Sequence, residues 1–193
     1  MKAGWTAAIA GAACLVGGAG AAHADLEEIR FGVMAHNTGI LVPQNGGKED
    51  GVNVHAQLEF STPGVLRWAF SPRPYVMASV NTAGETSYAA IGLDWRWKFA
   101  EGWALEPTLG YAVHDGDIDS PYDKADPRHG PYVEDHLLLG SRDVFRVGFG
   151  LTRDLTPRWA AQLQWDHLSH GQILGTGRNE GLDDLGVRLI YKR

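Results

Sequence analysis

Apolar and polar residues alternate along most of this chain, and no other feature limits its fold as much. Between 158 and 169, for example, Trp159, Leu163 and Trp165 share one parity while Gln162 has the other. Successive side chains of a β-strand point to opposite faces, so a period of two predicts strands with one apolar and one polar face. The pattern therefore predicts an all-β protein.

The alternation recurs often enough to predict eight strands. They cover 28–36, 52–61, 66–81 (interrupted by Pro72 and Pro74), 88–98, 103–114, 144–153, 158–169 and 182–192. Each strand with its connection takes about 21 residues, which suits a ten-residue spanning strand plus a turn. Short connections alternate with longer ones, as in outer-membrane barrels. The longer ones are 38–50, 114–140 and 170–181. We therefore predict an eight-stranded antiparallel transmembrane β-barrel.

A soluble β-barrel or sandwich is the alternative. Two features favour the membrane barrel. The apolar faces run uninterrupted over four or five positions and often carry Trp or Tyr near one end, as an aromatic girdle would. The opposite faces carry Arg, Glu, Asp, Gln and Gly, which suit a polar barrel interior better than exposed strands.

The first 24 residues have the form of a cleaved signal peptide. Lys2 precedes a Gly/Ala-rich apolar stretch, and Ala22-His23-Ala24 forms a small-x-small cleavage site before Asp25. A transmembrane anchor is less favoured because the run is short, and a lipoprotein site at Cys14 lacks the expected Leu before it. We therefore expect a signal peptide at 1–24 and one barrel domain at 25–193, in the outer membrane of a Gram-negative cell.

Charge and cysteine content exclude several other classes. The formal net charge is −6 at pH 7, which gives no electrostatic reason to bind nucleic acid. The one cysteine, Cys14, would leave with the signal peptide, so no disulfide is expected. No helix-length apolar segment follows residue 24, so a helical membrane protein is not expected.

Three polar residues near the C-terminus fall on the predicted lipid-facing side. His167 and Ser169 continue the outward parity of Trp165, and Asp183 shares the outward parity of Leu185 on the next strand. Polar groups facing lipid are costly and call for an explanation. Because the last two strands are consecutive and antiparallel, the three side chains should converge at the extracellular rim.

Together these residues have the parts of a serine hydrolase. A Ser hydroxyl becomes nucleophilic when an imidazole accepts its proton, and a carboxylate orients that imidazole. Ser169 and His167 share a strand face about 6–7 Å apart. Asp184 should face the lumen and Glu180 should lie in a loop, so Asp183 is the predicted acid. The alternative is that all three are polar residues at the edge of the bilayer.

At these positions the sequence resembles a known family. His167-x-Ser169, followed by Asn179-x-Gly181-x-Asp183 on the last strand, is similar to the PagL-type lipid A 3-O-deacylases. The resemblance implies an eight-stranded outer-membrane barrel that removes the ester-linked acyl chain at position 3 of lipid A. It also implies a catalytic triad on the outer surface, with His167 as base and Ser169 as nucleophile.

The chain departs from that family's pattern at two places. Asp183 stands where the acid is often Glu, and His170 stands where the family commonly has an Asn linked to the oxyanion hole. Backbone N–H groups at His170 and Gly171 are the expected oxyanion donors.

The acidic loop 114–136 is a candidate metal site. Asp115-x-Asp117-x-Asp119 is similar to the start of a calcium loop, but Ser120 and Pro121 break the pattern. A solvated extracellular loop is the preferred interpretation, and no His/Cys set has zinc-ligand spacing. We expect no metal site and no cofactor.

The sequence thus predicts a hydrolase of lipopolysaccharide, a lipid A deacylase whose partner is lipid A in the outer leaflet. Two other functions remain open. One is a non-catalytic outer-membrane barrel, and the other is a barrel acyl hydrolase acting on phospholipid. Homodimer formation is left open.

Overall fold

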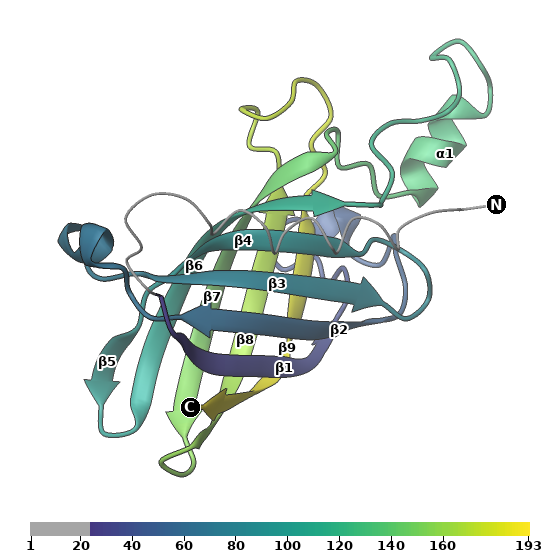
Figure 1. The fold of residues 1–193 in the computed structure, drawn as a ribbon. Helices are drawn as coiled ribbons and strands as arrows, with labels where there is room; N and C mark the ends of the chain where they lie inside the picture. The colour runs from purple at the N-terminus through teal and green to yellow at the C-terminus, as the bar shows by residue number, and fades with distance from the viewer. Residues whose placement is uncertain (1–23) are drawn as a thin grey trace.

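The computed structural model describes residues 24–193, and almost all of their regular structure is antiparallel β-sheet (Figure 1). The strands are β1 (Leu26–Ala35), β2 (Val52–Phe60), β3 (Arg73–Asn81), β4 (Tyr88–Asp94), β5 (Trp97–Ala100), β6 (Trp103–His114), β7 (Asp143–Asp154), β8 (Trp159–Ser169) and β9 (Leu182–Lys192). Three short helices lie in the connections: η1 (Pro43–Asn45), η2 (Gly64–Ala69) and α1 (His129–Asp135). No helix among residues 24–193 is both long and apolar enough to cross a membrane. The predicted signal peptide lies outside the described residues, apart from Ala24.

The strands close into a ring. Strands consecutive in sequence pair with each other, except β4 and β5, which both pair with β6, and β1 also pairs with β9. β5 continues β4 beyond a two-residue interruption at Trp95 and Arg96, so β4 and β5 form one of eight staves. The predicted eight-stranded antiparallel barrel is confirmed.

Two predicted strands are wrong at one end. The segment 66–72 is not strand: it contains part of η2, and the third stave begins only at Arg73. Pro72 in this segment and Pro74 just after it cannot donate backbone hydrogen bonds to a ladder. The predicted strand 88–98 breaks after Asp94, opposite Pro107 of β6, which has no N–H to offer.

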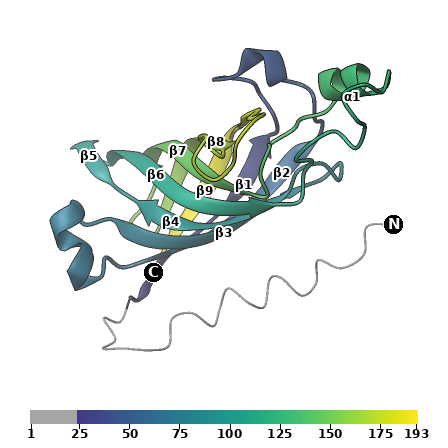
Figure 2. The same ribbon diagram turned by 90° about the horizontal axis from the view of Figure 1, so that it is seen from above.

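The two ends of the barrel differ. One end, called the loop end here, carries the connections 36–51, 82–87, 115–142 and 170–181. The other, called the turn end, carries the connections 61–72, 101–102 and 155–158. Figure 2 shows α1 beyond the loop end and η2 beyond the turn end.

The predicted parity holds around the ring. Large apolar side chains are exposed on the outside, among them Phe31, Val33, Val54, Ile91, Leu109, Val147, Phe149, Leu163 and Val187. Polar side chains are buried inside, among them Arg30, Gln57, Glu59, Asp94, Glu106, Arg146, Gln164, Asp166 and Arg188. An apolar outside with a polar inside is the arrangement of a membrane barrel.

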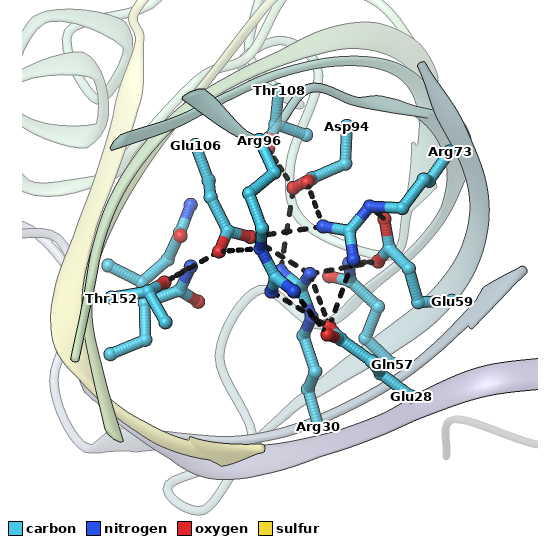
Figure 3. Close-up of polar contacts among 12 residues, drawn as sticks. Glu28, Arg30, Gln57, Glu59, Arg73, Asp94, Arg96, Glu106, Thr108 and Thr152 are labelled. Carbon is cyan, nitrogen blue, oxygen red and sulfur yellow. Dashed lines mark hydrogen bonds and ion pairs between the residues drawn. The ribbon is translucent and has the colours of Figure 1, made fainter. Parts of the chain in front are cut away.

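A network of charges fills the lumen near the turn end (Figure 3). Arg30 of β1 lies 2.8 Å from Glu28 and 2.9 Å from Glu106 of β6. Arg73 lies 2.9 Å from Asp94, its partner on the adjacent strand β4, while the contact between Arg30 and Glu106 joins β1 and β6, which are not paired. Because each buried charge has partners of opposite sign, its desolvation is offset within the network.

Part of the long loop 115–142 enters the barrel. Leu137, Leu138 and Leu139 are buried, and two of them pack with Tyr88 and Leu168 in an apolar cluster at the loop end of the lumen. These three residues lie just beyond the predicted solvated loop 114–136 and act as a plug.

Candidate active site on the outer face of β8 and β9

His167 and Asp183 face each other across β8 and β9. They are direct partners in the ladder, and His167 Nδ1 lies 2.8 Å from Asp183 Oδ1. An ionised carboxylate can only accept, so in this pair Nδ1 carries the proton and Nε2 is left as a base. Neighbouring positions of the same parity, Val147 and Val187, are exposed, which places the pair on the outer face.

Asp183 is fully buried although it points outward. The connection between β1 and β2 folds over it: the N–H groups of Leu41 and Val42 donate to Asp183 Oδ2 at 2.7 Å and 3.2 Å. The N–H of Thr38 donates to the Asp183 backbone oxygen at 2.7 Å. The acid is therefore held in place by hydrogen bonds to both carboxylate oxygens.

The imidazole of His167 is held by packing as well. Its ring stacks with that of Trp165 at a centroid distance of 6.1 Å and an interplanar angle of 20°. A Cβ at Gly181 would overlap His167 Cε1 and lie 3.1 Å from Nε2, so the ring occupies space that only glycine leaves free. Of the His167 side chain, 16% remains exposed, so the base is accessible.

Ser169 lies two residues beyond His167 at the end of β8, beside Phe145 of β7. It is half-buried and shares the outer face of the barrel with His167. Within residues 24–193, no hydrogen bond joins the Ser169 hydroxyl to His167. Catalytic hydrogen bonds often form fully only when substrate binds, so the absence of this bond is compatible with Ser169 as nucleophile and His167 as base.

His170 makes hydrogen bonds within the loop 170–181, a role that the sequence did not indicate. Its ring is buried and bonds to the backbone oxygen of Arg178 at 2.9 Å, while the N–H of Gln172 donates to its Nδ1 at 3.1 Å. Its own N–H donates to Asn179 Oδ1 at 3.1 Å. His170 thus organises the loop 170–181, and its N–H, expected as an oxyanion donor, is already engaged.

Gly171 follows in the left-handed conformation, with φ of 60°, and is exposed. Within the described part of the chain, no residue accepts a hydrogen bond from its N–H. Of the two expected donors, Gly171 is the one whose N–H points to no protein acceptor.

The two rejected acids lie elsewhere. Asp184 faces the lumen, where its carboxylate accepts from Asn53 Nδ2 at 2.8 Å and contacts His36 Nδ1 at 3.0 Å. Glu180 accepts from the Leu138 N–H at 2.9 Å and from Lys48 Nζ at 3.1 Å, so it joins three loops of the loop end.

Among residues 24–193, no three His, Cys, Asp or Glu side chains gather where a metal ion could be held. Sequence reasoning missed the contributions of Leu41 and Val42, because backbone N–H groups of a distant loop leave no signal in the residue pattern. Asn179 and Gly181 did leave one, in the spacing Asn179-x-Gly181-x-Asp183.

Among known proteins, only solved structures are similar to this chain, and they are similar in fold. No family model matches the chain, and no curated protein does. Among solved structures, the chain is similar to the outer membrane enzyme PagL, with 13% identity and a TM-score of 0.59 over 86% of this chain and 99% of that one. It is also similar to Neisserial surface protein A, with 12% identity and a TM-score of 0.52 over 89% of this chain and 99% of that one.

These likenesses and the inside-out polarity agree. The chain is a small outer-membrane β-barrel of a Gram-negative cell, as predicted. In such barrels the long loops are extracellular and the short turns periplasmic. The His167–Asp183 pair therefore lies on the lipid-facing surface near the extracellular end.

Proposed function

We propose that this barrel is a serine esterase that removes the 3-O-linked acyl chain of lipid A. The observation that carries the proposal is the His167–Asp183 pair on the lipid-facing surface, with Ser169 two residues from His167 on the same strand face. Placing a polar imidazole on a lipid-facing surface costs free energy, so such a residue is expected to have a function. The likeness to PagL in fold, and the resemblance at His167, Ser169 and Asp183, support the same activity.

The reaction follows from the roles of the three groups. Ser169 Oγ forms a bond to the acyl carbonyl carbon while its proton passes to His167 Nε2. The ester C–O bond then breaks, and His167 returns that proton to the departing sugar oxygen. Water, activated by the same imidazole, hydrolyses the acyl-serine and releases the fatty acid. Asp183 accepts the hydrogen bond from Nδ1 and stabilises the imidazolium that forms twice in the cycle.

Negative charge on the carbonyl oxygen needs donors that are already in place. The exposed N–H of Gly171 is the proposed donor, since that of His170 is taken by Asn179. Asn179 is proposed to act indirectly, because its hydrogen bond to His170 fixes the turn that carries Gly171.

A lipid substrate suits the position of the site. Ile40 and Leu41 on one side and Val147 on the other are exposed apolar residues near the pair. An amphiphile diffusing in the outer leaflet would bring its acyl chains to this surface and its ester groups to the rim. Lipid A is the abundant amphiphile of that leaflet.

The test is mass spectrometry of lipid A from cells that carry the wild-type chain, Ser169→Ala or Ser120→Ala. The wild type and Ser120→Ala should release one hydroxyacyl chain, and Ser169→Ala should lose at least about 10³-fold in rate. Ser120 is the control because it lies in the extracellular loop 115–142, outside the proposed site.

The same extracts distinguish the alternatives. Loss of acyl chains from phospholipid instead of lipid A would identify the barrel as a phospholipid acyl hydrolase. If neither lipid changes with any variant, although purified barrels are folded, the non-catalytic barrel is the correct description.

A further inference from the structure

The connection 61–72 between β2 and β3 is the longest at the turn end of the barrel and contains η2. Three of its apolar side chains are among the most exposed in the described chain: Val65 at 71%, Trp68 at 83% and Phe70 at 84%. Exposed apolar groups gathered on one short segment indicate a surface that another apolar phase covers.

The segment is held in this conformation by specific bonds. Trp95 Nε1 donates to the backbone oxygen of Ala69 at 2.9 Å, and Thr62 Oγ1 donates to that of Ser71 at 3.0 Å. Phe70 and Ser71 both adopt the left-handed conformation, with φ of 65° and 55°. Such backbone is disfavoured for residues other than glycine, so packing and hydrogen bonds must maintain it. The outward projection of Phe70 is therefore a fixed feature of the fold.

The surface is continuous with the lipid-facing side of the barrel. The bond from Trp95 ties η2 to the junction of β4 and β5, and the exposed residues Trp97, Phe99 and Trp103 lie on the strands just beyond that junction. Aromatic residues at one level around a barrel mark the boundary between hydrocarbon and headgroups. In Figure 1, η2 is the blue coil at the left, which projects beyond the ends of β2 and β3.

The charge of the connection 61–72 also favours contact with lipid. Between 61 and 74 there is no Asp or Glu, and Arg67 on η2 is exposed beside the three apolar side chains. An arginine next to apolar residues suits the level of lipid phosphates, where its stem stays apolar and its head binds anionic oxygen.

We propose that the segment 62–71 inserts into the periplasmic leaflet of the outer membrane and binds its phospholipids. In this arrangement Val65, Trp68 and Phe70 enter the acyl boundary while Arg67 pairs with headgroup phosphate. This membrane anchor is independent of the proposed esterase, because it lies at the opposite end of the barrel from His167.

The test uses spin labels in the folded barrel. The chain from Asp25 onward has no cysteine, so single cysteines can be placed at Val65→Cys and Trp68→Cys, with Glu101→Cys as the matched control in the exposed β5–β6 turn. Each labelled barrel is reconstituted in phosphatidylethanolamine–phosphatidylglycerol vesicles. Relaxation by oxygen, which partitions into lipid, is compared with relaxation by a water-soluble nickel chelate.

We expect the labels at 65 and 68 to respond more to oxygen than to the nickel chelate, and the label at 101 to show the reverse. Equal response of all three labels to the aqueous reagent would overturn the proposal. If 65 and 68 are aqueous in vesicles but shielded from a soluble maleimide in spheroplasts, a protein covers this surface instead, and the proposal is also wrong. Heat-modifiable gel migration checks that each labelled barrel is folded.

Discussion

At the scale of single residues, the proposed chemistry depends on a glycine. Gly181 lies directly beneath the imidazole of His167, at a distance that excludes even a methyl group. Trp165 stacks on the same ring, and Asp183 binds its Nδ1. The ring is thus confined by stacking, by a hydrogen bond and by the absence of a side chain.

The substitution Gly181→Ala should displace His167 and lower esterase activity about 10²-fold, since catalysis is sensitive to shifts of about 1 Å. The barrel should remain folded, because Gly181 precedes β9 and contributes no ladder side chain. Rates on purified lipid A and heat-modifiable migration measure the two effects. Gly130→Ala is the control, since a Cβ there meets nothing within 4 Å. Unchanged activity of Gly181→Ala would contradict the assigned position of the base.

At the scale of elements, the connection between β1 and β2 belongs to the site as much as β8 and β9 do. It comes from the opposite end of the sequence and reaches Asp183 because β1 and β9 pair along the seam of the barrel. Its N–H groups donate to Asp183 Oδ2, the carboxylate oxygen that does not contact His167.

Replacing Leu41 by proline removes one of those N–H groups. A hydrogen bond to a charged group contributes about 1.5–3 kcal/mol, so Leu41→Pro should reduce kcat about 10- to 100-fold. Leu41→Ala keeps the N–H and should retain kcat, although its KM for long acyl chains is free to change. The comparison is made by steady-state kinetics on folded barrels. Equal kcat for the two variants would show that the N–H does not position Asp183.

The same connection is anchored in the lumen by His36, just beyond the end of β1. Its ring lies 3.0 Å from Asp184 of β9 and 2.7 Å from Glu49, which in turn accepts from Thr86 at 2.7 Å. Burial opposes a charge on His36, but the two carboxylates outweigh it and raise its pKa to about 9 from 6.5.

This raised pKa predicts how stability depends on pH. The contribution of the imidazolium is fully present below about pH 6.5 and is lost as the pH rises through about 9. Wild type should therefore exceed His36→Gln in melting temperature at neutral pH, and the difference should shrink by about pH 10. Calorimetry or thermal gel-shift at several pH values measures it. A difference that stays constant with pH would mean that His36 is neutral in the folded barrel.

At the scale of the whole molecule, the barrel is held from inside by charge. Arg30 contacts carboxylates from β1, β2, β4 and β6, so a single guanidinium ties half of the ring together. The apolar side chains of a membrane barrel face lipid and form no hydrophobic core. In this barrel, ion pairs in the lumen hold the strands together instead.

Arg30→Met should destabilise the barrel by about 3–5 kcal/mol, because it leaves buried carboxylates without their partner. Arg158→Met, in the exposed turn 155–158, should change stability by less than about 0.5 kcal/mol. Guanidinium unfolding in vesicles, followed by tryptophan fluorescence, compares them. Similar midpoints for both variants would show that the network is dispensable for stability.

Much of this architecture could be predicted from the sequence, for a physical reason. A strand has a period of two, so the parity of Trp165, His167 and Ser169 already places them on one face, and Asp183 rather than Asp184 follows by the same count. The strand boundaries failed at 66–72 and at Asp94, where prolines and an interrupted ladder, rather than hydrophobicity, decide the backbone.

By itself, then, the sequence determined the barrel, its inside and outside, and the shared face of His167, Ser169 and Asp183. Only the tertiary structure decided that Asp183 is covered by Leu41 and Val42, that His170 supports a loop, and that Trp68 and Phe70 in the connection 61–72 are exposed. The difference has one cause. Strand parity is encoded locally and repeats, whereas loop conformation depends on contacts between segments far apart in the chain and carries no period to detect.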